Sequence, residues 1–95
     1  MIDKVKLVLR LSGTALDGEV EDLINAAIAD MRLVGIKIPE GKGASSDTLG
    51  DPLLDRAVML YAKAEFGFND DGERYRKAYD YLKCALSLAG AYMEE

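Results

Sequence analysis

Histidine is absent from this chain of 95 residues, and Cys84 is its single cysteine. A Ser-His-Asp or Cys-His arrangement needs histidine as its general base, so the sequence excludes both. Histidine is also the commonest ligand of transition metals, and a lone cysteine cannot form an intramolecular disulfide. We therefore expect no catalytic residue and no cofactor, and we interpret Cys84 as an ordinary helix residue.

Two glycine-containing stretches look like binding loops but lack the residues that such loops need. Residues 41–43 (Gly-Lys-Gly) would form a phosphate-binding loop only with glycine in place of Ile36 and serine or threonine in place of Gly43. Residues 69–72 (Asn-Asp-Asp-Gly) would form a calcium loop only with an oxygen-bearing side chain in place of Gly67. We expect neither site and interpret residues 69–72 as a helix-capping turn.

Charged residues gather in two places. Segment 17–30 contains no basic residue and five acidic ones: Asp17, Glu19, Glu21, Asp22 and Asp30. The dipole at a helix start favours negative charge, which explains this cluster better than a bound divalent cation. Four basic residues interleaved with tyrosines form the second group: Arg74, Arg76, Lys77 and Lys83. Such a composition can bind nucleic acid, but acidic residues lie among the basic ones, so we favour a solvated face.

The overall composition is that of a folded globular protein, with 49% hydrophobic and 31% charged residues. A formal net charge of -5 argues against tight wrapping of nucleic acid, because such binding depends on phosphate neutralisation by Lys and Arg. No stretch approaches the roughly 18 apolar residues of a membrane span, and Lys4, Lys6 and Arg10 interrupt the N-terminal apolar positions. We expect one domain over residues 1–95, with neither a signal peptide nor a membrane segment.

Apolar spacing predicts an all-α fold, a small bundle of about four helices. Residues 17–34 repeat apolar positions with the helical period, with Asp17 as the N-cap and a left-handed Gly35 at the end. Residues 51–66 begin with Asp51 and Pro52, a cap followed by a first-position proline. The apolar positions of this helix cover more than a third of its circumference, so we expect it to be the central one, ended by Gly67.

The remaining segments are a first helix, a long loop and a fourth helix. Apolar residues alternate with others over residues 3–11, as in a strand, but the chain offers no second strand. A lone strand would leave its backbone groups unpaired, so a helix is the better interpretation. Residues 36–50 contain Pro39 and several glycines and predict a long loop between the second and third helices, mobile in an isolated subunit. Residues 72–88 form the fourth helix.

The fourth helix has two apolar stripes where one would suffice. The main stripe comprises Tyr75, Ala78, Tyr79, Leu82, Leu86 and Ala89. The second comprises Tyr81, Ala85, Leu88 and Tyr92 and lies about 100° round the helix axis. A small domain does not need that much apolar surface for its own core. We predict that Tyr81, Leu88 and Tyr92 form an oligomer or partner interface.

Three groups of residues keep an order and spacing that span nearly the whole chain. They are residues 5–11 with 17–27, residues 51–67, and residues 73–83. Each alone is an ordinary amphipathic helix, so the specificity lies in the combination. Together they resemble the small helical head-tail connector, or head-completion, proteins of tailed bacteriophages and prophages.

The resemblance implies a non-enzymatic subunit of the phage head. About a dozen copies would join into a closed ring beneath the portal protein, extend the DNA channel and present a platform to the next head-closure or tail protein. DNA would pass without sequence-specific binding, and no membrane would be involved. The subunit would belong to the virion and assemble in the cytoplasm of the host bacterium. Ala57 and Tyr61 would lie in the core, whereas the loop over residues 37–50 matches no pattern of the family.

The sequence leaves three alternative functions to consider. A helical adaptor or regulator that binds a protein as a monomer or dimer would use the same apolar stripes. A DNA-binding domain is disfavoured by the net negative charge, and a metal-dependent enzyme by the missing ligands. Negative charge around a DNA channel, in contrast, repels phosphate and lets DNA slide.

Overall fold

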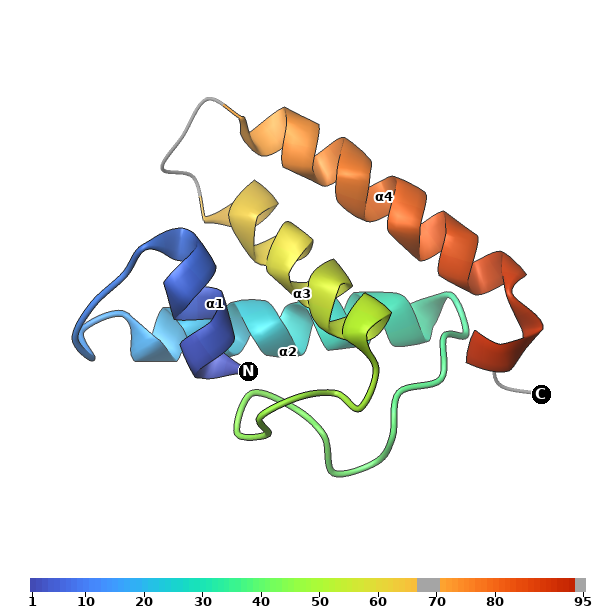
Figure 1. Ribbon diagram of the computed structural model, residues 1–95, viewed down its shortest axis with the longest axis horizontal. Helices are drawn as coiled ribbons and strands as arrows, with labels where there is room; N and C mark the ends of the chain where they lie inside the picture. Colours follow the sequence, from blue (N-terminus) through green and yellow to red (C-terminus); the bar gives the residue numbers. More distant parts are fainter. Residues whose placement is uncertain (67–70, 94–95) are drawn as a thin grey trace.

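The third helix, α3 (Pro52–Glu65), is the element around which the others pack. The computed structural model describes residues 1–66 and 71–93, and α1 (Ile2–Leu9), α2 (Asp17–Leu33) and α4 (Gly72–Leu88) each contact α3. Figure 1 shows α4 beside α3, with α2 passing behind. A short 3-10 turn, η1 (Gly90–Tyr92), follows α4. The predicted all-α bundle of about four helices, with the third at the centre, is confirmed.

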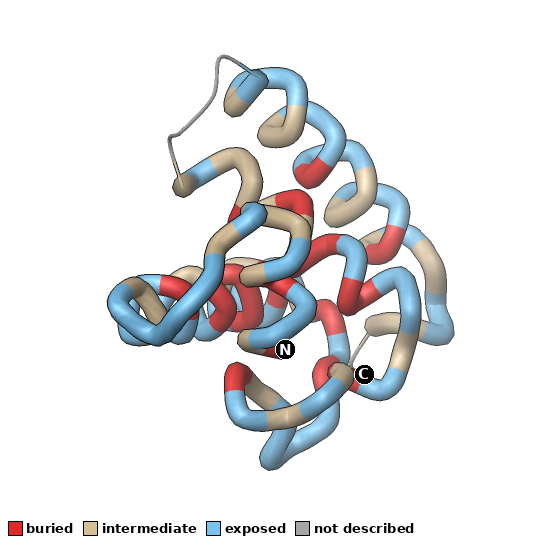
Figure 2. The backbone as a smooth tube through the Cα atoms, turned by 60° about the vertical axis from the view of Figure 1, so that its left-hand side comes forward, coloured by how far each residue is buried: buried red, intermediate tan, exposed pale blue. Residues whose placement is uncertain are grey.

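Buried and exposed residues alternate along the helices (Figure 2), and in α2 the buried residues recur with the helical period. The inward face of α2 is formed by Val20, Ile24, Ala27, Ile28 and Met31. Because α3 has neighbours on several sides, its buried residues spread around much of the helix, and Ala57 is fully buried as expected. Tyr61 is half-buried, and its ring packs edge-on against that of Tyr79 in α4, with 5.2 Å between ring centroids. None of the described helices has the length and apolar character that a membrane crossing requires.

The predicted long loop between α2 and α3 is present, and its apolar side chains anchor it to the core. The buried loop residues are Ile36, Ile38, Ala44 and Leu49. Ile36 also forms an isolated antiparallel bridge with Met93, and the N–H of Lys37 donates to the carbonyl of Tyr92 at 2.6 Å. In residues 1–66 and 71–93 this bridge is the only β pairing, and it ties the C-terminal segment to the loop.

Two helices end in left-handed residues, one of them as predicted. Gly35 has φ of +89°. Its N–H donates to the backbone carbonyl of Arg32, and the N–H of Ile36 donates to the carbonyl of Met31 at 3.1 Å. This pattern satisfies the last carbonyls of a helix. The same pattern ends α1 at Leu9, because Arg10 adopts φ of 58°. The predicted end at Leu11 was therefore two residues too late.

One predicted helix cap is confirmed and another is wrong. The Asp51 carboxylate accepts a hydrogen bond from the N–H of Leu53 at 2.8 Å, and Pro52 is the first residue of α3. Asp17, however, is the first helical residue of α2 and not its cap. Its carboxylate instead forms an ion pair with Lys6 of α1, with 2.8 Å between Nζ and Oδ1. This ion pair competes with the helix start for the carboxylate oxygen. Gly67, Asn69 and Asp70, proposed as helix-end and capping residues, lie outside the described residues.

Candidate interaction surface

The outward face of α4 presents large apolar side chains to solvent. Tyr81 is 78% exposed and Leu88 is 81% exposed, and the exposed Cys84 lies between them. At about 100° per residue, these positions lie opposite the buried Tyr79 and Leu86. The same face carries basic residues nearer the start of the helix. We call the exposed set Arg74, Lys77, Tyr81, Cys84 and Leu88 the α4 strip.

A buried tyrosine fixes the direction in which the α4 strip points. The Tyr79 hydroxyl donates to the Asp30 carboxylate of α2 at 2.6 Å, and Lys83 reaches the same carboxylate at 3.0 Å. Burial and the adjacent Asp30 strongly raise the pKa of Tyr79, so its hydroxyl remains a donor. Burial also raises the pKa of Asp30, but the bonds from Tyr79 and Lys83 outweigh it and leave that pKa below its ordinary value. These charge-assisted hydrogen bonds hold one side of α4 against α2, so the α4 strip on the opposite side faces solvent.

The basic residues of α4 divide between the core side and the solvent side. Arg76 pairs with Glu65 at 2.5 Å and with Asp80 at 3.6 Å, and it lies over the rings of Tyr61 and Tyr79. Lys83 is held by Asp30. Of these four cations, Arg74 and Lys77 extend outward, next to acidic partners at 3.6 Å each. The four cations therefore do not form one continuous track for a phosphate backbone.

Tyr92, the third predicted interface residue, lies apart from the α4 strip. It belongs to η1 and is half-buried, and its hydroxyl donates to the Asp51 carboxylate at the start of α3 at 2.8 Å. With Pro39, Leu54 and neighbouring residues it lines a groove of about 400 Å³. Its hydroxyl is thus used within the subunit, and a contact of Tyr92 with another chain stays a prediction.

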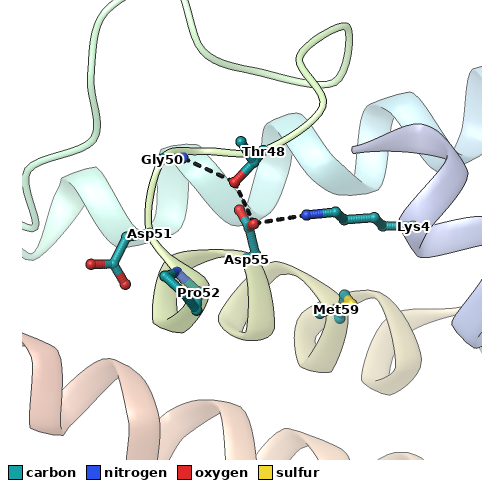
Figure 3. A pocket seen from close by; sticks show the side chains of 7 residues that line it. All are labelled: Lys4, Thr48, Gly50, Asp51, Pro52, Asp55 and Met59. Carbon is teal, nitrogen blue, oxygen red and sulfur yellow. Dashed lines mark hydrogen bonds and ion pairs between the residues drawn. The ribbon is translucent and has the colours of Figure 1, made fainter.

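A second hollow, of about 510 Å³, surrounds a buried carboxylate at the junction of α1, α3 and the long loop (Figure 3). Asp55 accepts hydrogen bonds from the Thr48 hydroxyl at 2.5 Å, the Leu49 N–H at 2.7 Å and the Lys4 ammonium at 3.1 Å. Burial raises the pKa of Asp55, but these bonds outweigh it and hold the pKa below its ordinary value. The Asp55 carboxylate accepts bonds from α1 and from the long loop, so it joins three segments of the chain.

Comparison with known families decides what kind of protein this surface belongs to. The family described as Phage connector protein matches residues 1–93, which covers every helix of the structure. This chain belongs to that family. The resemblance drawn from the order and spacing of the helices is confirmed. No curated protein and no solved structure matches the chain.

Membership gives the connector a structural role at the junction of phage head and tail. Within residues 1–66 and 71–93, no three His, Cys, Asp or Glu side chains come together in a way that would hold a metal ion. The acidic residues of α2 are spread along that helix, and Asp30 is already bound by Tyr79 and Lys83. The α4 strip combines exposed apolar and basic side chains, and protein interfaces contain both kinds.

Sequence reasoning placed Tyr81 and Leu88 correctly on an exposed face but missed the partners of two carboxylates, the buried Asp55 and the half-buried Asp30. Asp55 lies seven residues before the buried Ala62, on the same side of α3. A charged residue on an apolar helix face was the available signal, because it needs partners to be buried. Asp30 gave a weaker signal, since it lies at the edge of the apolar face of α2 and its partners come from distant α4.

Proposed function

We propose that this connector is a ring subunit of the phage head-tail junction. Copies join into a closed ring beneath the portal, extend the channel through which DNA passes, and present a platform to the next head-closure or tail protein. The observation that supports this role is the exposure of Tyr81 and Leu88 on a helix locked in place by Tyr79. In a member of a connector family, apolar side chains exposed to this extent suit burial against another protein.

The charge of the chain supports passage of DNA without capture. The formal net charge of the chain is -5. A negative wall repels phosphate, so DNA slides past it. The proposed location is the virion, with assembly in the host bacterial cytoplasm, and the proposed role includes no chemical step.

Sedimentation velocity at increasing protein concentration, with and without purified portal rings, tests the proposal. We expect the chain to sediment as a large ring-sized assembly, either alone or when portal rings are present. A chain that stays monomeric and does not co-sediment with portal rings would contradict the ring role. A stable dimer that ignores the portal would instead support a helical adaptor or regulator.

A further inference from the structure

A second exposed strip lies on α2, on the side of that helix turned away from the core. Leu33 is 84% exposed, and the residues above it on the same face are exposed as well. We call the set Glu19, Asp22, Ala26, Ala29 and Leu33 the α2 strip. Its first part is acidic, its middle has small side chains, and its end is apolar. No described residue of the subunit covers these side chains.

The α2 strip and the α4 strip match position by position. Both helices have 17 residues, and both strips use the third, sixth, tenth, thirteenth and seventeenth positions. A parallel, in-register pairing places Glu19 against Arg74 and Asp22 against Lys77. It also places the small Ala26 against the large Tyr81, Ala29 against Cys84, and Leu33 against Leu88. An antiparallel pairing would place acidic residues against Leu88, so charge selects the parallel one.

The α2 strip also has a hollow where a large side chain is expected. Three residues of the strip, the neighbouring Leu23 and the end of α3 line a depression of about 380 Å³, so that its lining is Glu19, Asp22, Leu23, Ala26, Glu65 and Phe66. In the parallel pairing the Tyr81 ring of a second copy lies over Ala26, at this depression. Leu23, Ala26 and Phe66 form the apolar part of its lining, and an aromatic side chain is a frequent anchor of protein interfaces.

We propose that the α4 strip of one copy packs in parallel against the α2 strip of the next copy, with Tyr81 in the hollow beside Ala26. The two strips are different surfaces of one subunit, so the contact is head-to-tail, the kind that forms a ring when the rotation between copies closes. This inference rests on the proposed function and identifies the surfaces through which the copies join. The long-range attraction comes from the charged ends, and the stability from the apolar ends.

Disulfide trapping tests the pairing because the native Cys84 already lies on one strip. A chain with Ala29→Cys and Cys84→Ser is mixed with the wild-type chain, so that each chain has one cysteine. The mixture is oxidised at a concentration where sedimentation shows assemblies, or on portal rings. We expect a mixed disulfide dimer, because the in-register pairing brings the two cysteines within bonding distance. The matched control is Ala15→Cys with Cys84→Ser, since Ala15 is also an exposed alanine but lies on neither strip.

The possible results separate the pairing from the ring role. Assemblies in which the Ala29→Cys chain gives no mixed dimer, or no more of it than the Ala15→Cys control, would overturn the pairing and leave the ring role standing. A dominant Cys84 dimer of the wild-type chain alone would also overturn it, in favour of contact between two α4 helices. If no assembly forms even on portal rings, the ring role is contradicted, and the pairing with it.

Reversing one charge pair provides a second measurement. Lys77→Glu places a carboxylate opposite Asp22, and we expect subunit association to become about tenfold weaker. Adding Asp22→Lys to the same chain restores an opposite pair and should recover most of the lost association. If Lys77→Glu has no effect, or Asp22→Lys fails to rescue it while both variants melt like the wild type, the pairing is wrong.

Discussion

Asp55 connects three segments of the chain through one buried carboxylate. Its partners are a hydroxyl and an N–H from the long loop and the ammonium of Lys4 in α1. We expect Asp55→Ala to lower the free energy of unfolding by about 3 kcal/mol, since it leaves the buried Leu49 N–H and a cation without an acceptor. Urea denaturation measures the change.

The matched control for this variant is Asp47→Ala, on the same loop. Asp47 is exposed, and a substitution there should change the free energy of unfolding by less than about 0.5 kcal/mol. Equal effects of the two substitutions would show that the hydrogen bonds of Asp55 do not anchor the loop.

The lowered pKa values of Asp55 and Asp30 predict loss of stability in acid. A carboxyl group whose pKa is lower in the folded state stabilises the fold fully above its unfolded pKa, and this contribution is lost as pH falls through the folded value. The ordinary value is 3.8, so the loss is expected as pH falls below that region. In thermal melts at a series of acidic pH values, the melting temperature of Asp55→Asn should fall less steeply with pH than that of the wild type. The melting temperature of Asp47→Asn should fall as that of the wild type does. An unchanged slope for Asp55→Asn would contradict the assignment.

At the scale of single residues, the sequence predicted local interactions better than distant ones. The Asp51 cap could be predicted because its partner, the N–H of Leu53, is two residues away. Asp17 also looked like a cap, but Lys6 of another helix engages its carboxylate. The bonds of Asp55 to Lys4 and of Asp30 to Tyr79 join residues far apart in the chain, so no local pattern could reveal them.

At the scale of elements, the end of α2 depends on a backbone conformation that only glycine adopts easily. Gly35 has φ of +89°, and a Cβ there would lie 2.9 Å from the end of the Met93 side chain. We expect Gly35→Ala to destabilise the fold by about 1 kcal/mol, mainly through the strained backbone. Gly18→Ala, in helical backbone with open space around its Cβ, should be neutral or slightly stabilising. Thermal denaturation of both variants checks this; equal melting temperatures would contradict it.

Helices α2, α3 and α4 could be predicted because each repeats its apolar residues with the helical period, whereas α1 was predicted only because no partner strand exists for residues 3–11. Boundaries of α2, α3 and α4 agree within a residue or two, and α1 ends early only because Arg10 accepts a left-handed conformation. The packing of the long loop could not be predicted. Its buried residues, such as Ile36 and Leu49, have no period, and their contacts come from distant segments.

At the scale of the whole molecule, the proposed assembly depends on apolar surface that the subunit does not bury itself. Tyr81 and Leu88 lie outward because Tyr79, Asp30 and Lys83 hold the opposite side of α4 against the bundle. Sequence reasoning could identify this excess, because two stripes on one helix exceed the needs of a small core. It could not identify the complementary hollow beside Ala26, which forms only when α2 meets the end of α3.

The most direct test of this dependence is sedimentation velocity of the wild type and of the double variant Tyr81→Ser, Leu88→Ser, each alone and with portal rings. Both substituted side chains are exposed, so we expect the variant to melt like the wild type but to lose the ring-sized assembly. Leu7→Ser, which changes a leucine 78% exposed on α1, should assemble normally. A double variant that still forms the wild-type assembly would contradict the claim that the outward face of α4 holds the copies together.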